Sequence, residues 1–273
     1  MRPNRTSVTL LSTMLFAGAL AACGVDDAPK EYNSLVPWMW HSYATASDEE
    51  LAKGIIALAG ASSEVTADSP VKAQIGHLSA ADIADLGLSA RDVTRARGMF
   101  VVTEFNCKLA QLEKIATSLK QQTVYPDAYD SYARTYTSSV DDYFARKTNT
   151  LSWATDLKST QLGTTFSEHL NGGARYLPDL GKEQSPFGAA LLQRTYLAKA
   201  ATSSDSDKSW DQDYQIDVFV ERKPGKILHL FAAWRHINFG WIDTDSDTMV
   251  KQMLSAFVDW DTQTEAACKK GLP

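Results

Sequence analysis

The first part of the chain has apolar residues at helical spacing, interrupted by helix start and stop signals. Ser47 and Glu50 have the spacing of a capping box, and apolar residues follow at helical intervals at Leu51, Ile55 and Leu58. Start signals recur at residues 79–82 and 89–92, and glycines that can end a helix follow both of them. We therefore predict a small helical layer over residues 37–97.

The pattern changes at Gly98. Residues 99–105 form a β-rich run, and residues 108–121 return to helical spacing. Strand-like runs follow at residues 131–137, 151–157, 162–169, 174–177, 189–198, 214–222 and 227–239. Turn residues separate these runs, for example Asn-Gly-Gly at 171–173 and Pro-Gly at 224–225. Short connections between successive strands indicate an antiparallel sheet.

The chain closes with a long amphipathic helix, in which the apolar stripe consists of Val250, Met253, Leu254, Phe257 and Trp260. The predicted fold class is therefore α+β, with a curved antiparallel sheet wrapped on this helix. The order of one strand, one helical segment, several antiparallel strands and a final helix resembles the START-like, helix-grip superfamily over residues 98–271. That resemblance implies an internal cavity between sheet and helix, within a domain at 98–273. The helical segment after the first strand is shorter than the pair of helices usual there, and the N-terminal layer lies outside the pattern.

The N-terminus has the pattern of a targeting signal. Arg2 and Arg5 precede an apolar run at residues 8–22, which is too short to span a bilayer core of about 30 Å as a helix. Residues 20–23 (Leu-Ala-Ala-Cys) resemble the lipobox of bacterial lipoproteins. The resemblance implies removal of a signal peptide at 1–22 and modification of Cys23 with a diacylglyceryl thioether and a further acyl chain such as palmitate. The alternative is an ordinary secretory peptide with an incidental cysteine.

Lipidation implies attachment to a lipid bilayer in the cell envelope, because two or more acyl chains anchor stably. Gly24 resembles the residue that accompanies outer-membrane sorting, so the expected location is the outer membrane, facing the periplasm or the cell surface. Residues 23–36 are small, acidic and punctuated by proline, which predicts a flexible tether. Two interpretations remain for Trp38 and Trp40: they dip into the lipid interface, or they pack onto the domain.

Composition limits the class of protein. Hydrophobic residues make up 44% of the chain and aromatic residues 10%, which excludes a disordered chain. The formal charge is −6, and no long basic run occurs, so nucleic acid is not an expected partner. Loss of the two N-terminal arginines makes the mature chain more negative, so membrane attachment is expected to rest on lipid.

The cysteines support a second prediction. With Cys23 assigned to lipid, Cys107 and Cys268 remain as a pair in a compartment that permits disulfides. We predict that these two are joined, and the alternative is two buried free thiols.

The last hairpin indicates a binding face. A two-residue turn at 224–225 predicts cross-strand pairs Val220 with His229, Val218 with Phe231, Ile216 with Ala233, and Tyr214 with Arg235. This face is mostly apolar and is expected to point inward. The other face, with Gln215, Asp217 and Glu221 opposite Leu228, Ala232 and Trp234, is expected to meet solvent.

An inward His229 and Arg235 need partners, because unpaired buried cations are costly. Either acidic side chains satisfy them internally, or they meet the polar head of a ligand in a cavity. The ligand-binding hypothesis names His229, Arg235, Tyr214 and Phe231.

Motifs for catalysis, metals or phosphate binding are absent from the sequence, so it predicts no cofactor, metal or catalytic residue. The leading hypothesis is a non-enzymatic, membrane-anchored lipoprotein that binds an apolar small molecule or lipid. One alternative is a structural or protein-interaction lipoprotein with a filled core. Another is a hydrolase or cyclase whose site combines His229, Arg235, Tyr214 and Asp217 without a sequence motif.

Overall fold

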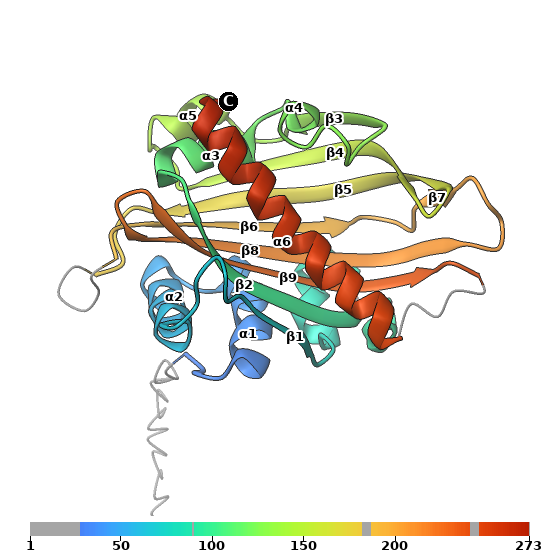
Figure 1. Ribbon diagram of the computed structural model, residues 1–273, viewed down its shortest axis with the longest axis horizontal. Helices are drawn as coiled ribbons and strands as arrows, with labels where there is room; N and C mark the ends of the chain where they lie inside the picture. The colour runs from blue at the N-terminus through green and yellow to red at the C-terminus, as the bar shows by residue number, and fades with distance from the viewer. Residues whose placement is uncertain (1–27, 89, 182–186, 241–245, 273) are drawn as a thin grey trace, which may run out of the picture.

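One large antiparallel sheet organises the protein (Figure 1). The computed structural model describes residues 28–88, 90–181, 187–240 and 246–272, and within them nine strands pair in the order β1-β2-β9-β8-β6-β5-β4-β3, with β7 paired to β5. The strands are β1 (Val71–Ile75), β2 (Arg97–Asn106), β3 (Ser131–Tyr136), β4 (Thr150–Gln161), β5 (Thr164–Leu177), β6 (Ala190–Leu197), β7 (Thr202–Ser203), β8 (Ser209–Lys223) and β9 (Lys226–Asn238). The predicted α+β class and the antiparallel sheet are confirmed.

The long C-terminal helix α6 (Asp247–Lys270) crosses one face of the sheet (Figure 1). Ser246 begins this helix by accepting a hydrogen bond from the backbone of Met249. Its apolar stripe packs against β2 and β9, where Phe257 contacts Phe231 with ring centroids 4.4 Å apart. The helices α3 (Leu109–Thr117) and α4 (Gln121–Val124) lie on the same side, and the short α5 (Val140–Phe144) precedes β4.

The opposite face of the sheet is covered by α1 (Tyr32–Thr45) and α2 (Asp48–Ala61). The predicted capping box of Ser47 and Glu50 begins α2. Trp40 is fully buried and packs edge-on against Tyr214 and Trp234, with centroids 5.7 and 5.9 Å away. Trp38 packs against the same core, so the tryptophan pair belongs to the domain interior and the lipid-interface interpretation is wrong.

Two boundaries near the N-terminus differ from the prediction. The expected tether extends to residue 36, but α1 begins at Tyr32, and Leu35 and Val36 are fully buried. The stretch predicted to be helical, 37–97, also contains β1, and its later helical turns are the short 3₁₀ segments Ala80–Leu86 and Val93–Arg95. Residues 71–75 form a strand because their backbone groups hydrogen-bond to β2. This tertiary pairing cannot be predicted from the local sequence pattern.

The predicted turn at residues 171–173 lies inside β5 instead. A Cβ atom at Gly172 would stand 2.7 Å from Nε1 of Trp153, and one at Gly173 would stand 2.8 Å from the carbonyl oxygen of Leu151. These glycines therefore mark a close approach of neighbouring strands and not a chain reversal. The runs predicted at 162–169 and 174–177 consequently form one strand of 14 residues.

The β8–β9 hairpin has the predicted turn but a different register. Lys223 pairs with Lys226 across the turn, and the register then shifts because Arg222 lies between the paired positions Glu221 and Lys223. Arg222 donates to the backbone carbonyls of Ser62 and Val65 beyond α2. The bulge therefore connects the hairpin to the N-terminal layer, and it moves the β8 side chains from Gln212 to Glu221 to the face opposite the predicted one.

Cys107 and Cys268 form the predicted disulfide, with Cα atoms 5.7 Å apart. The bond joins the segment after β2 to the last turns of α6. Beside it, the Glu265 carboxylate of α6 accepts a hydrogen bond of 2.8 Å from the backbone of Asn106 at the end of β2. The C-terminal end of α6 is thus held to the sheet by a covalent and a polar link.

The predicted signal peptide and lipidation site at Cys23 lie outside the described residues. Of the helices that the structure does describe, none is long and apolar enough to cross a membrane.

Candidate functional site

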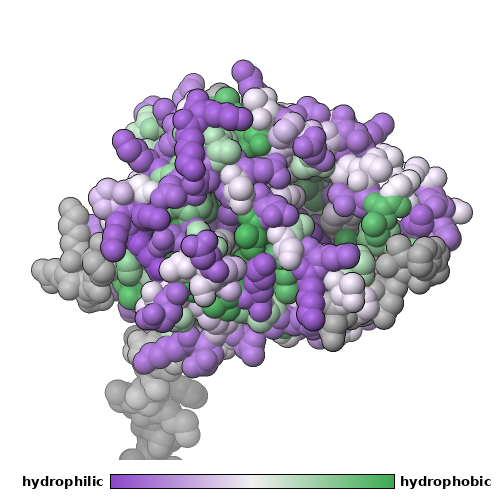
Figure 2. Space-filling view, in the orientation of Figure 1, coloured by the Kyte–Doolittle hydropathy of each residue, from purple (hydrophilic) through white to green (hydrophobic). Residues whose placement is uncertain are grey.

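A cavity of about 430 Å³ lies between α6 and the inner face of the sheet. Its floor comes from alternate residues of β2, β4, β5, β6, β8 and β9, and its sides come from α3, α6 and the residues leading from α4 into β3. In the space-filling view, hydrophobic residues are visible in a hollow beside α6 (Figure 2). The volume falls in the range of small-molecule sites.

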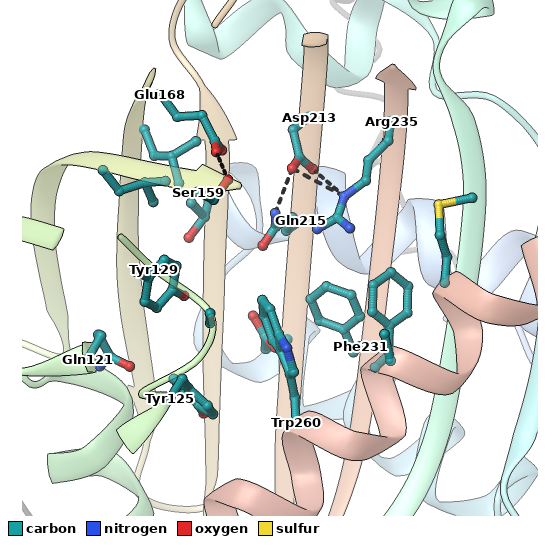
Figure 3. Close-up of a pocket in the computed structure, with 18 of the residues that line it drawn as sticks. Gln121, Tyr125, Tyr129, Ser159, Glu168, Asp213, Gln215, Phe231, Arg235 and Trp260 are labelled. Carbon is teal, nitrogen blue, oxygen red and sulfur yellow. Dashed lines mark hydrogen bonds and ion pairs between the residues drawn. The ribbon is translucent and has the colours of Figure 1, made fainter. Parts of the chain in front are cut away.

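Aromatic and aliphatic side chains form most of the cavity wall. Phe231 projects from β9 and Trp260 from α6, and Tyr125 stacks on Trp260 with centroids 5.6 Å apart (Figure 3). Tyr129, which precedes β3, and Leu170 on β5 also line the cavity. Such a lining favours an occupant with extensive apolar surface.

His229 is the most deeply buried basic group of the cavity wall. Its Nδ1 lies 2.7 Å from an oxygen of Asp261 on α6, and its Nε2 lies 3.2 Å from an oxygen of Asp217 on β8. Burial alone lowers the pKa of His229, but the two carboxylates outweigh it and raise the pKa to about 9. The imidazolium therefore connects α6 to the sheet across the cavity edge.

Arg235 is also paired internally. Its Nε lies 3.2 Å from the carboxylate of Asp213, which accepts a second hydrogen bond of 2.8 Å from the amide of Gln215 (Figure 3). Burial raises the pKa of Asp213, and the neighbouring Arg235 opposes that rise. The guanidinium group lies over the rings of Trp210 and Phe257, at 5.5 and 5.2 Å from their centroids.

A second acidic group, Glu168 on β5, occupies the same end of the cavity. Its carboxyl group accepts a 2.8 Å hydrogen bond from the hydroxyl of Ser159 on β4 (Figure 3). Burial raises the pKa of Glu168 to about 7. The cavity thus has an aromatic region and a polar end, which Figure 3 shows around Glu168, Asp213 and Arg235.

The structure brings three of the four predicted ligand-binding residues, His229, Phe231 and Arg235, to the cavity wall. The placement of Tyr214 in this set is wrong, because the bulge at Arg222 puts Tyr214 on the opposite face, where it is fully buried against Trp40. The same shift also removes Tyr214 from the constellation considered for a hydrolase or cyclase.

Asp217 and Gln215 were expected to meet solvent, and that expectation is wrong for the same reason: both line the cavity. Asp213 and Glu168 were missed. A signal for Glu168 exists, since it stands between Phe166 and Leu170 at two-residue spacing, which places its carboxyl group on the apolar face of the strand.

Comparison with known proteins finds similar solved structures but no match in sequence. No protein-family model and no curated protein sequence matches this chain. The structure is similar to the lipid transfer and protein localization domain of human StarD13, with a TM-score of 0.41 and 8% identity over 65% of this chain and 79% of that one. It is also similar to a START superfamily protein from Mycobacterium smegmatis, with a TM-score of 0.40 and 10% identity over 63% and 97%.

A third similar structure is dicamba monooxygenase bound to 3,6-dichlorosalicylic acid, with a TM-score of 0.40 and 12% identity over 67% of this chain and 52% of that one. The similar structures therefore include an oxygenase as well as the StarD13 domain and a START superfamily protein. Similarities this weak carry no argument about function, which is argued below from the cavity itself.

Proposed function

We propose that the protein binds an apolar small molecule or lipid in the cavity between α6 and the sheet. The observation that carries this proposal is a partly open cavity of about 430 Å³ with mainly aromatic and aliphatic walls. The leading alternative is a structural protein with a filled core. Such a protein is not expected to keep a cavity of this size, because unfilled volume lowers stability. The role proposed is binding without catalysis.

The polar groups support the same proposal. His229 and Arg235 are neutralised by carboxylates of the chain itself, so neither needs a charged ligand for compensation. The interior is consequently suited to an occupant that is largely uncharged.

Filling the cavity tests the proposal. Thr155 is buried on the inner face of β4, and Lys158 is exposed on the outer face of the same strand. We expect the purified protein to bind diphenylhexatriene, with a rise in probe fluorescence that saturates near one probe per chain. Thr155→Trp should abolish this rise because the indole occupies the space, whereas the matched control Lys158→Trp should retain it. A wild-type protein that leaves the probe dark contradicts the proposal.

We further propose that the chain is held on a membrane through acylated Cys23, as its resemblance to a lipobox implies. The expected result is that Cys23→Ala moves the protein from the detergent phase to the aqueous phase, or leaves it unprocessed, in a Triton X-114 partition. Mass spectrometry of the wild-type N-terminal peptide should show the added acyl mass. Retention of the variant in the detergent phase with normal processing means that another element anchors the chain.

A further inference from the structure

Among the described residues, Glu168 differs from the other acidic groups of the cavity in forming no ion pair with a basic side chain. Asp213 pairs with Arg235, and Asp217 and Asp261 both pair with His229. Across the described residues, the one hydrogen bond to the Glu168 carboxyl comes from the hydroxyl of Ser159, and it engages a single oxygen, Oε1. The second carboxyl oxygen is therefore left for another donor.

The position of Glu168 makes this incomplete pairing costly. The residue is 6% exposed and lines the cavity, so bulk water does not solvate its carboxyl group freely. Burial is the main effect that raises the pKa of Glu168 and disfavours its negative charge, and Asp213 nearby acts in the same direction, whereas Ser159 and Arg235 oppose the rise. A hydrogen-bond donor brought by a ligand relieves this cost.

The cations of the cavity are engaged elsewhere. Arg235 faces Asp213, and Arg97 donates to the amide oxygen of Gln74. Arg134 donates to the carbonyl of Ala116 in the last turn of α3 and lies 4.3 Å from the ring centroid of Trp153. A helix C-terminus and an aromatic face both stabilise a guanidinium group, so Arg134 has a structural role. Among the described residues of the cavity wall, Nε of Arg134 and the ring nitrogens of Trp153 and Trp210 also have no hydrogen-bond partner. The acceptor on which the inference rests is the second carboxyl oxygen of Glu168.

We propose that the ligand carries a hydroxyl or amino group at one end, and that this group donates a hydrogen bond to the carboxyl group of Glu168. The remainder of the ligand lies along the aromatic wall formed by Tyr129, Phe231 and Trp260 (Figure 3). This inference rests on the proposed function and names the ligand class: an apolar alcohol or amine. A fatty acid is disfavoured, because its carboxylate meets the carboxyl groups of Glu168 and Asp213.

Four ten-carbon probes test the proposal by displacing diphenylhexatriene from the full chain: 1-decanol, decylamine, 1-methoxydecane and decanoic acid. Methylation of the alcohol removes the donor and keeps the oxygen, so we expect 1-decanol to bind about tenfold more tightly than 1-methoxydecane. Glu168→Leu should abolish this preference while still binding 1-methoxydecane. Glu168→Gln keeps an acceptor and should keep part of the preference. Asp156→Asn, which removes a carboxylate that is 78% exposed on neighbouring β4, should change nothing.

The outcomes separate the two proposals. Displacement by all four probes with equal affinity, or a preference that survives in Glu168→Leu, overturns the inference and leaves the proposed function intact. Tightest binding of decanoic acid overturns it as well, since the head group then meets a cation. Stronger binding of decylamine than of 1-decanol identifies an amine as the donor, and the reverse identifies a hydroxyl. If diphenylhexatriene itself does not bind, the proposed function fails and this inference with it. If Glu168→Leu does not fold, the reduced preference expected in Glu168→Gln decides.

Discussion

Replacing His229 by leucine is expected to destabilise the protein by about 3 to 5 kcal/mol. The imidazole contacts Asp217 on one side and Asp261 on the other, so its removal leaves two buried carboxyl groups without a basic partner. Chemical unfolding monitored by tryptophan fluorescence measures the loss. His169→Leu is the matched control, because His169 is partly exposed and pairs with the exposed Asp156; exposed pairs contribute about 1 kcal/mol or less.

The pH dependence of stability provides a second measurement of the same cluster. The pKa of His229 is raised to about 9 in the folded protein from an ordinary value near 6.5. A raised histidine pKa contributes stability that is complete below pH 6.5 and is lost as pH rises through 9. The free energy of unfolding should therefore fall over this interval in the wild-type protein, and the fall should be smaller in His229→Leu. Equal slopes in the two proteins would mean that His229 is not charged in the fold.

Removing the disulfide is expected to have an effect of similar size. Cys107 and Cys268 are separated by 161 positions, and a crosslink over a loop this long stabilises by about 5 kcal/mol in the chain-entropy model. Cys107→Ala combined with Cys268→Ala should therefore unfold at much lower denaturant concentration than the wild type. Full reduction of the wild-type protein should give the same midpoint as the double variant.

The control for this experiment is the double variant treated with reductant, which should show no further change. Alkylation of the denatured, unreduced wild type should label neither Cys107 nor Cys268. Labelling of both, or identical unfolding of wild type and double variant, contradicts a stabilising bond.

The sequence predicts the order of strands and helices well, because alternation and capping are local signals. The run at 99–105 becomes β2, the last apolar stripe becomes α6, and the Pro-Gly turn at 224–225 connects β8 to β9. The Cys107–Cys268 pair follows from parity once Cys23 is set aside. These features depend on a few neighbouring residues or on a simple count.

The binding face was harder to predict, because it depends on tertiary contacts. The bulge at Arg222 arises where that side chain reaches carbonyl groups beyond α2, a contact with a segment about 160 positions earlier. One extra residue exchanges the two faces of β8, which is why Tyr214 was placed in the cavity and Asp217 outside it. Gly172 and Gly173 were predicted to form a turn for a related reason. The groups that require glycine at these positions, the indole of Trp153 and the backbone of Leu151, belong to the neighbouring strand β4.

The attachment of α6 at one end determines how the cavity can open. The disulfide at Cys268 and the Glu265–Asn106 hydrogen bond fix the C-terminal end, while the N-terminal half, with Met249 and Met253, lines the cavity without a covalent link to the sheet. A helix of 24 residues is about 36 Å long. Pivoting such a rod by about 10° around its fixed end displaces the free end by about 6 Å, the width of an alkyl chain, while the pivot stays nearly still. Such a motion requires breaking polar contacts of α6, among them that of Asp261 with His229 and that of Thr264 with Tyr125.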